Sequence, residues 1–100
     1  MNRAELVRKI TEIMPITERL VCLAEEASEL AQAALKYRRT LIDTNPTPML
    51  EEEAYDKLME EIADVELCLE TLYTNDAFIN LIMNQKAERW LRRLENRDES

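Results

Sequence analysis

Apolar residues recur every three or four positions along nearly the whole chain, the spacing that places them on one side of an α-helix. The first such segment opens at Asn2, which has the side chain of a helix N-cap and is followed three residues later by Glu5. Pro15 interrupts the pattern, because the residue before a proline is displaced from the helical region of backbone space. A short first helix ending near Met14 is therefore predicted.

A second periodic segment begins near residue 16 and continues to about Arg39, which predicts the longest helix, roughly 35 Å if unbroken. The following stretch, Thr40–Pro48, reads TLIDTNPTP and is rich in residues that favour turns. It predicts the one long loop of the chain. Thr47 is expected to cap the next helix, with Pro48 at its first position.

The third helix is expected to carry Glu51–Glu53 in its first turn, where the positive end of the helix dipole favours acidic side chains. Its apolar stripe ends near Leu72, and Thr-Asn-Asp at residues 74–76 predicts a break and the cap of a fourth helix. The polar segment 96–100 is expected to fray. The predicted apolar side of the fourth helix consists of Phe78, Ile79, Ile82, Met83, Ala87, Trp90, Leu91 and Leu94.

Composition narrows the fold class to all-α. The sequence has no glycine and three prolines, so the positive-φ positions of tight hairpins and phosphate-binding loops have no natural occupant. A hydrophobic content of 46% is enough for one core, and 100 residues rarely hold two. We expect a single domain over residues 1–100 with a four-helix bundle-like fold. Because so short a chain builds a small core, association into a homodimer or homotetramer is also expected.

Charge and residue usage exclude several classes of function. The net charge of −8 argues against a nucleic-acid partner, whose binding depends on neutralising phosphates. The absence of histidine removes catalytic triads and histidine-based zinc sites. Cys22 and Cys68 lie in apolar runs, which is typical of reduced core thiols in a cytoplasmic protein. No stretch approaches the ~18 continuous apolar residues of a membrane span, so no membrane partner is expected.

Two acidic pairs lie at the apolar faces of predicted helices. On the second helix Glu26 falls inside the apolar arc and Glu29 lies one turn later at its edge, and Glu61 and Asp64 repeat this arrangement on the third. Four carboxylates at a packing face are costly without a counter-ion, because burial and like charge both oppose ionisation. Oxygen ligands without histidine suit Mg²⁺ or Mn²⁺ better than zinc. The alternative is a pair of ordinary solvated helix faces.

The same residues carry a family resemblance. Residues 25–29, EEASE, and 61–64, EIAD, match the EExxE and ExxD motifs of the all-α nucleoside triphosphate pyrophosphohydrolases. The flanking LAEEASELAQAALKYRR and LMEEIADVELCLETL resemble the motif helices of the MazG-like branch, and the resemblance covers most of residues 5–94. It implies Mg²⁺-dependent hydrolysis of a nucleoside triphosphate to the monophosphate and pyrophosphate. By this resemblance the metal ligands are Glu26, Glu29, Glu61 and Asp64.

Such a hydrolysis also needs an activated water and cations that hold the phosphates. Glu25 is the candidate carboxylate for activating water as a catalytic base. In the family a lysine and an arginine near the last helix contact phosphate, and KAER, from Lys86 to Arg89, resembles that motif. Lys36, two turns after Glu29, is a second candidate for phosphate binding. Each basic residue has an alternative reading as a side chain that extends along the core to solvent.

Departures from the family leave the substrate open. The 31 residues between Glu29 and Glu61 look long for it, and the aromatic pair that clamps cytosine in the dCTP pyrophosphatase branch has no counterpart beside Glu26. The histidine expected after the second motif of phosphoribosyl-ATP pyrophosphohydrolases is also missing. The expected substrate is therefore a (d)NTP, with phosphoribosyl-ATP as an alternative. A non-catalytic acidic module that binds a basic partner is the alternative from a different class.

Overall fold

The computed structural model describes residues 1–42, 50–72 and 76–99, with side chains up to residue 97. Within these ranges the chain is all-α and contains no strand. The predicted all-α class and the number of helices are confirmed. The four helices are α1 (Arg3–Ile13), α2 (Ile16–Ile42), α3 (Glu51–Glu70) and α4 (Asp76–Glu99).

The start of α1 and its junction with α2 follow the local signals. Asn2 lies in the N-cap position, and its side-chain oxygen accepts a hydrogen bond of 2.9 Å from the backbone N–H of Glu5. Pro15 separates α1 from α2, as predicted. α2 is longer than predicted and includes Thr40, whose hydroxyl donates to the backbone carbonyl of Tyr37 at 2.7 Å. This bond satisfies the hydroxyl inside the helix, so Thr40 is compatible with another helical turn.

The later boundaries differ more from the predictions. α3 begins at Glu51 with Leu50 in the N-cap position and no side-chain cap, while Thr47 and Pro48 lie outside the described residues. The glutamates of its first turn are present as predicted. The expected fraying of the polar segment 96–100 stays a prediction, and α4 continues as a helix to Glu99. The good helix formers of residues 91–95, Leu-Arg-Arg-Leu-Glu, favour this extension.

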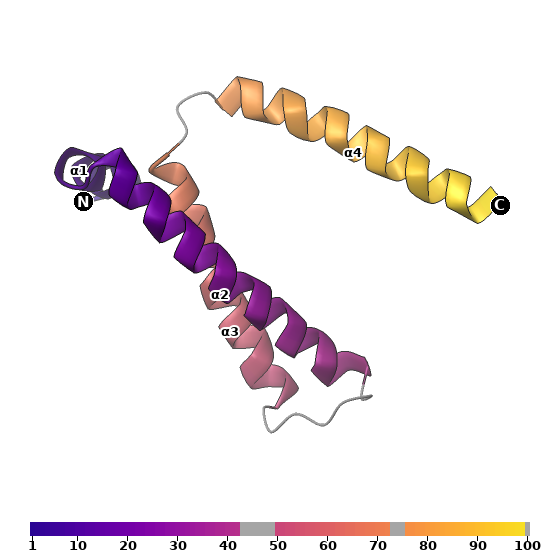
Figure 1. Ribbon diagram of the computed structural model, residues 1–100. Coiled ribbons are helices and arrows are strands. Elements are labelled where there is room, and N and C mark those ends of the chain that lie inside the picture. The colour runs from indigo at the N-terminus through magenta and orange to yellow at the C-terminus, as the bar shows by residue number, and fades with distance from the viewer. Residues whose placement is uncertain (43–49, 73–75, 100) are drawn as a thin grey trace.

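α2 and α3 form a helical hairpin, the one extensively packed pair among the described helices (Figure 1). Ala33 on α2 and Ala54 on α3 are buried in it, and residues this small allow two helix backbones to approach closely. Near the same end, the rings of Tyr37 and Tyr55 lie with their centroids 5.8 Å apart in a tilted arrangement. The hairpin therefore fixes the faces of α2 and α3 that carry the two acidic motifs.

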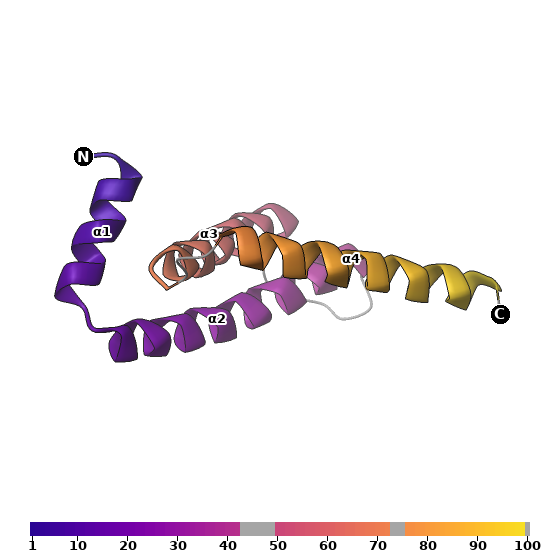
Figure 2. The ribbon, with the colours of Figure 1, turned by 90° about the horizontal axis from the view of Figure 1, so that it is seen from above.

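α1 turns away from the hairpin (Figure 2) and α4 extends away from it (Figure 1), so these two helices do not close a bundle around it. Arg19 stabilises the α1–α2 junction, because its guanidinium donates hydrogen bonds to the backbone carbonyls of Met14 and Thr71. Arg3 forms a 3.1 Å ion pair with Glu70 at the end of α3. α4 extends away from these contacts, so its predicted apolar side is not a core within one chain.

Both cysteines are free and half-buried, as expected for reduced thiols. Burial, and then the nearby Cys22, raise the pKa of the Cys68 thiol above its ordinary value, which keeps it protonated at neutral pH. Within the described residues, no helix is long and apolar enough to cross a membrane.

Candidate metal centre

The hairpin brings three glutamates from the two motif helices together. Glu26 and Glu29 lie one turn apart on α2, and Glu61 projects from the facing side of α3. One carboxylate oxygen from each lies within 4.8 Å of the other two. Three of the four metal ligands predicted from sequence therefore converge, although 31 residues separate Glu29 from Glu61.

Burial and missing partners distinguish this group from an ordinary acidic surface. Glu61 is 2% exposed and is the one charged side chain that is fully buried in the described part of the chain. Its Oε2 has no hydrogen-bond partner, and neither does the buried Oε2 of Glu26. Carboxylate oxygens removed from water without a donor are costly. Two such oxygens on residues of one converging carboxylate group fit a hard cation, which accepts oxygen ligands in preference to nitrogen or sulfur.

The electrostatics of Glu26 show how closely the acids are grouped. Burial raises the pKa of Glu26 above its ordinary value of 4.5, and the charges of Glu29, Asp64 and Glu61 raise it further. All three neighbours thus disfavour the ionised form of the same carboxyl group. A bound cation would reverse this effect, because it favours the charged form of every ligand.

Lys57 is a member of the site that the sequence analysis did not identify. Its Nζ lies 2.9 Å from Oε1 of Glu61 and 3.8 Å from Oε2 of Glu60. The hydrogen bond with Glu61, followed by the charge of Glu61, raises the pKa of Lys57 above 10.5, so the ammonium form is favoured. The signal that could have found it is the i,i+4 spacing between Lys57 and Glu61, which places both on one face of a helix.

An open pocket of about 250 Å³ adjoins the carboxylates. Lys36 of α2 and Lys57 of α3 both line it, so two basic residues border the same space as Glu29 and Glu61. Lys36 therefore lines the pocket beside the carboxylates, and its phosphate-binding role stays a prediction. The full lining consists of Glu29, Gln32, Ala33, Lys36, Lys57 and Glu61.

Other residues predicted for the site lie further out. Asp64 is exposed and outside the three-carboxylate group, although its charge acts on Glu26. Glu25 is exposed on α2 and does not line the pocket. Lys86 and Arg89 lie on α4, which projects away from the hairpin, so one chain does not bring them to the carboxylates (Figure 1).

With this geometry established, the chain was compared with known protein families, curated protein sequences and solved structures. No match was found in any of the three comparisons. The function must consequently be inferred from the carboxylate group, its flanking lysines and the motif residues. What these groups can do together is to hold a divalent cation and to present two positive charges to an anion beside it.

Proposed function

We propose that this protein is an Mg²⁺-dependent nucleoside triphosphate pyrophosphohydrolase, which converts a (d)NTP and water to the (d)NMP and pyrophosphate. The observation that carries the proposal is the convergence of Glu26, Glu29 and Glu61, two of which have a buried carboxylate oxygen without a partner. The resemblance of residues 25–29 and 61–64 to the EExxE and ExxD motifs supports the same conclusion. Mn²⁺ would serve in place of Mg²⁺, because both prefer oxygen ligands.

The proposed reaction is a displacement at the α-phosphorus. A water oxygen forms a bond to that phosphorus, the bond to the bridging oxygen of the β-phosphate breaks, and pyrophosphate leaves with the electron pair. The cation, when bound, would neutralise charge on the phosphoryl oxygens and lower the pKa of water. A triphosphate would otherwise be repelled by a protein with a net charge of −8.

The chain's own residues divide the remaining tasks. Glu26, Glu29 and Glu61 would hold the cation, and Asp64 would add negative charge beside them. Lys36 and Lys57 border the adjoining pocket and would hold phosphate oxygens. Glu25 is proposed to accept a proton from the attacking water. Because Glu25 is exposed on α2, this role requires the nucleotide to extend along α2.

The proposal is tested by measuring pyrophosphate release from a panel of ribo- and deoxyribonucleoside triphosphates with Mg²⁺, with Mn²⁺ and with EDTA. We expect release that depends on metal and stops in EDTA. Phosphoribosyl-ATP is included in the panel, and release from it alone would identify the alternative substrate. If folded protein releases no pyrophosphate from any substrate, the proposal is contradicted and a binding module is favoured.

A second experiment concerns Lys57. Lys57→Met is expected to strengthen Mn²⁺ binding several-fold, because the ammonium group no longer competes with the metal for Oε1 of Glu61. The same change is expected to raise KM for the nucleotide about tenfold, because one cation is lost from the phosphate pocket. Isothermal titration with Mn²⁺ and steady-state kinetics measure the two effects.

Lys9→Met on α1 is the matched control for Lys57→Met, because it removes the same group from an exposed position far from the pocket. Neither Mn²⁺ affinity nor KM should change in this variant. Weaker Mn²⁺ binding together with an unchanged KM in Lys57→Met would show that Lys57 only supports the fold of α3.

A further inference from the structure

One chain exposes much more surface than its size requires. Its accessible surface is 8257 Å², whereas a compact monomer of 11.8 kDa exposes about 5,900 Å². Its radius of gyration is 17.5 Å, against about 13 Å for a compact domain of 100 residues. The excess of about 2,300 Å² per chain lies in the range that each partner buries in an obligate homodimer.

Part of this exposed surface is an apolar stripe along α4. At 100° per residue, Ile79, Met83, Trp90 and Leu94 fall on one side of the helix, while Gln85 falls on the opposite side. Trp90 is 67% exposed and Met83 is 59% exposed. A stripe with this spacing is the pattern of a helix that packs against another element, and one chain provides none along most of it.

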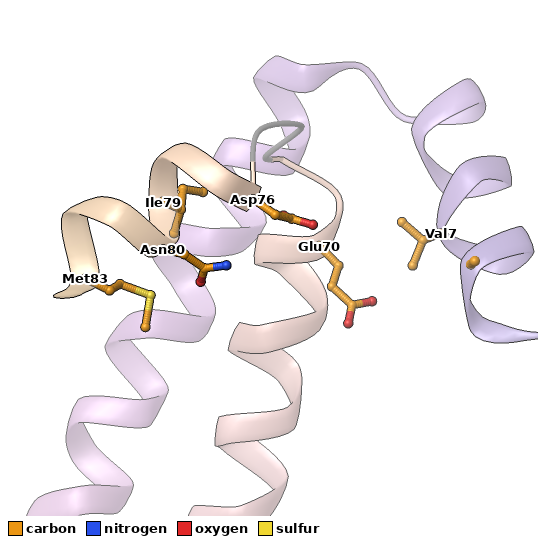
Figure 3. Close-up of a pocket in the computed structure, with 7 residues that line it drawn as sticks. Val7, Glu70, Asp76, Ile79, Asn80 and Met83 are labelled. Carbon is orange, nitrogen blue, oxygen red and sulfur yellow. The ribbon is translucent and has the colours of Figure 1, made fainter.

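The stripe continues into an open pocket of about 620 Å³ between α1 and α4. Figure 3 shows Val7 of α1 and Met83 of α4 on opposite sides of Glu70, which projects between them from the end of α3. Ile79 and Met83 belong both to the stripe and to the pocket lining. The stripe therefore reaches a pocket of mixed polar and apolar lining at the N-terminal end of α4.

Charge restricts what can cover this surface. Lys86 and Arg93 lie along the stripe, and the sequence from Lys86 to Arg97 contains five basic and two acidic residues. Two α4 helices packed in parallel would bring these cations together, which like-charge repulsion opposes, and an antiparallel pair would place them opposite residues 76–85, which contain one acid. α3 is complementary, because it carries nine acidic residues and one lysine and exposes Met59 and Leu67.

We propose that two copies of this chain form an obligate dimer in which α4 of each copy packs along the α2/α3 hairpin of the other. The exchange is symmetric, so each interface buries the same two surfaces, as in most homodimers. The lengths are compatible, since the 24 residues of α4 span about 36 Å and the 20 residues of α3 about 30 Å. Within one chain α4 has no packing partner along most of its length. The acidic and partly apolar hairpin of the second copy would provide that partner.

The first test uses the unmodified protein. Light scattering at micromolar concentration is expected to give a mass of two copies, and the emission of Trp90, the one tryptophan of the chain, should be blue-shifted and protected from acrylamide. Dilution should lower the melting temperature, because association and folding are coupled. A mass of one copy would overturn the proposal, and so would an assembly in which acrylamide quenches Trp90 freely.

A variant pair tests the position of the interface. Met83→Glu places a charge in the stripe and is expected to weaken dimerisation at least tenfold, or to abolish folding with it. Gln85→Glu adds the same charge on the opposite side of α4 and should retain the dimer. Retention of the dimer with protected Trp90 in Met83→Glu would overturn the assignment of this surface.

Cross-linking between copies tests which elements meet. Protein labelled with ¹⁵N is refolded with unlabelled protein and treated with a carbodiimide, which joins amines to carboxylates in direct contact. We expect mixed-isotope peptides that join Lys86 to acidic residues of α3. Mixed pairs that join α4 only to α4 would overturn the proposed exchange. None of these measurements depends on catalytic activity, so their failure is separate from a failure of the proposed reaction.

Discussion

Substitution of Glu61 by glutamine is expected to abolish metal-dependent pyrophosphate release. Glu61 is the buried member of the carboxylate group, and it approaches Glu26 and Glu29 from the opposite helix. Loss of its negative charge removes the α3 ligand from the proposed centre, and a metal ion supplies several kcal/mol of transition-state stabilisation. At 1.36 kcal/mol per tenfold change in rate, kcat/KM should fall by more than about a hundredfold.

The matched control for Glu61→Gln is Glu66→Gln, the same chemical change on the same helix at an exposed position. It should retain wild-type kcat/KM and the same metal dependence. Pyrophosphate release by both variants is measured over a range of Mg²⁺ concentrations, because a variant with only reduced metal affinity regains activity at high Mg²⁺ concentration. Full activity of Glu61→Gln at ordinary Mg²⁺ would remove the metal-centre assignment.

Thermal stability is expected to respond to metal in the wild-type protein and not in Glu61→Gln. Metal at about 100 times its Kd stabilises the folded state by about 2.7 kcal/mol, which corresponds to an increase in Tm of about 10–20 °C for a domain of this size. The structure supports this coupling, because Oε2 of Glu61 and Oε2 of Glu26 are buried without hydrogen-bond partners and a bound cation would provide one. Differential scanning calorimetry with Mg²⁺, Mn²⁺ and EDTA measures the shift.

In EDTA the order of stability should reverse, with Glu61→Gln melting above the wild-type protein. The amide group has no charge to desolvate, and its N–H groups can donate to the neighbouring carboxylates, which offer only acceptors. Lys57 loses its nearer partner but keeps Glu60 at 3.8 Å, and it is half-exposed to solvent. A lower Tm of Glu61→Gln in EDTA would instead mean that the ion pair with Lys57 outweighs the cost of the buried charge.

The two outcomes for Glu61→Gln separate function from folding. A variant that is more stable without metal and inactive with it has lost a ligand and retained its fold. A variant that is inactive and shows no cooperative unfolding under either condition has lost its structure, and its inactivity then says nothing about the metal. Natural sites commonly show the first pattern, because groups arranged for binding are strained before the ligand arrives.

Sequence alone was sufficient to predict the number of helices and the acidic pair that α2 contributes to the site. Asn2, Pro15 and the glutamates at the start of α3 act through short-range sterics, hydrogen bonds and the helix dipole, so their effects can be predicted locally. The pairing of Glu26 with Glu29 follows in the same way, because i and i+3 always share a helix face. The choice of a hard cation followed from residue types, since the chain has no histidine.

Tertiary structure decided which acids meet and which cations accompany them. The crossing of α2 and α3 brings Glu61 rather than Asp64 within reach of Glu26 and Glu29, a result of helix register that no local pattern encodes. Lys57 joins the site because the same packing buries Glu61 beside it. The stripe of α4 shows the same division, since its spacing predicts burial, whereas the direction of the helix leaves Trp90 exposed in one chain. The periodicity of apolar residues is set by the order of residues along the helix. The burial of those residues depends on which other element packs against the helix, and only the assembled fold determines that element.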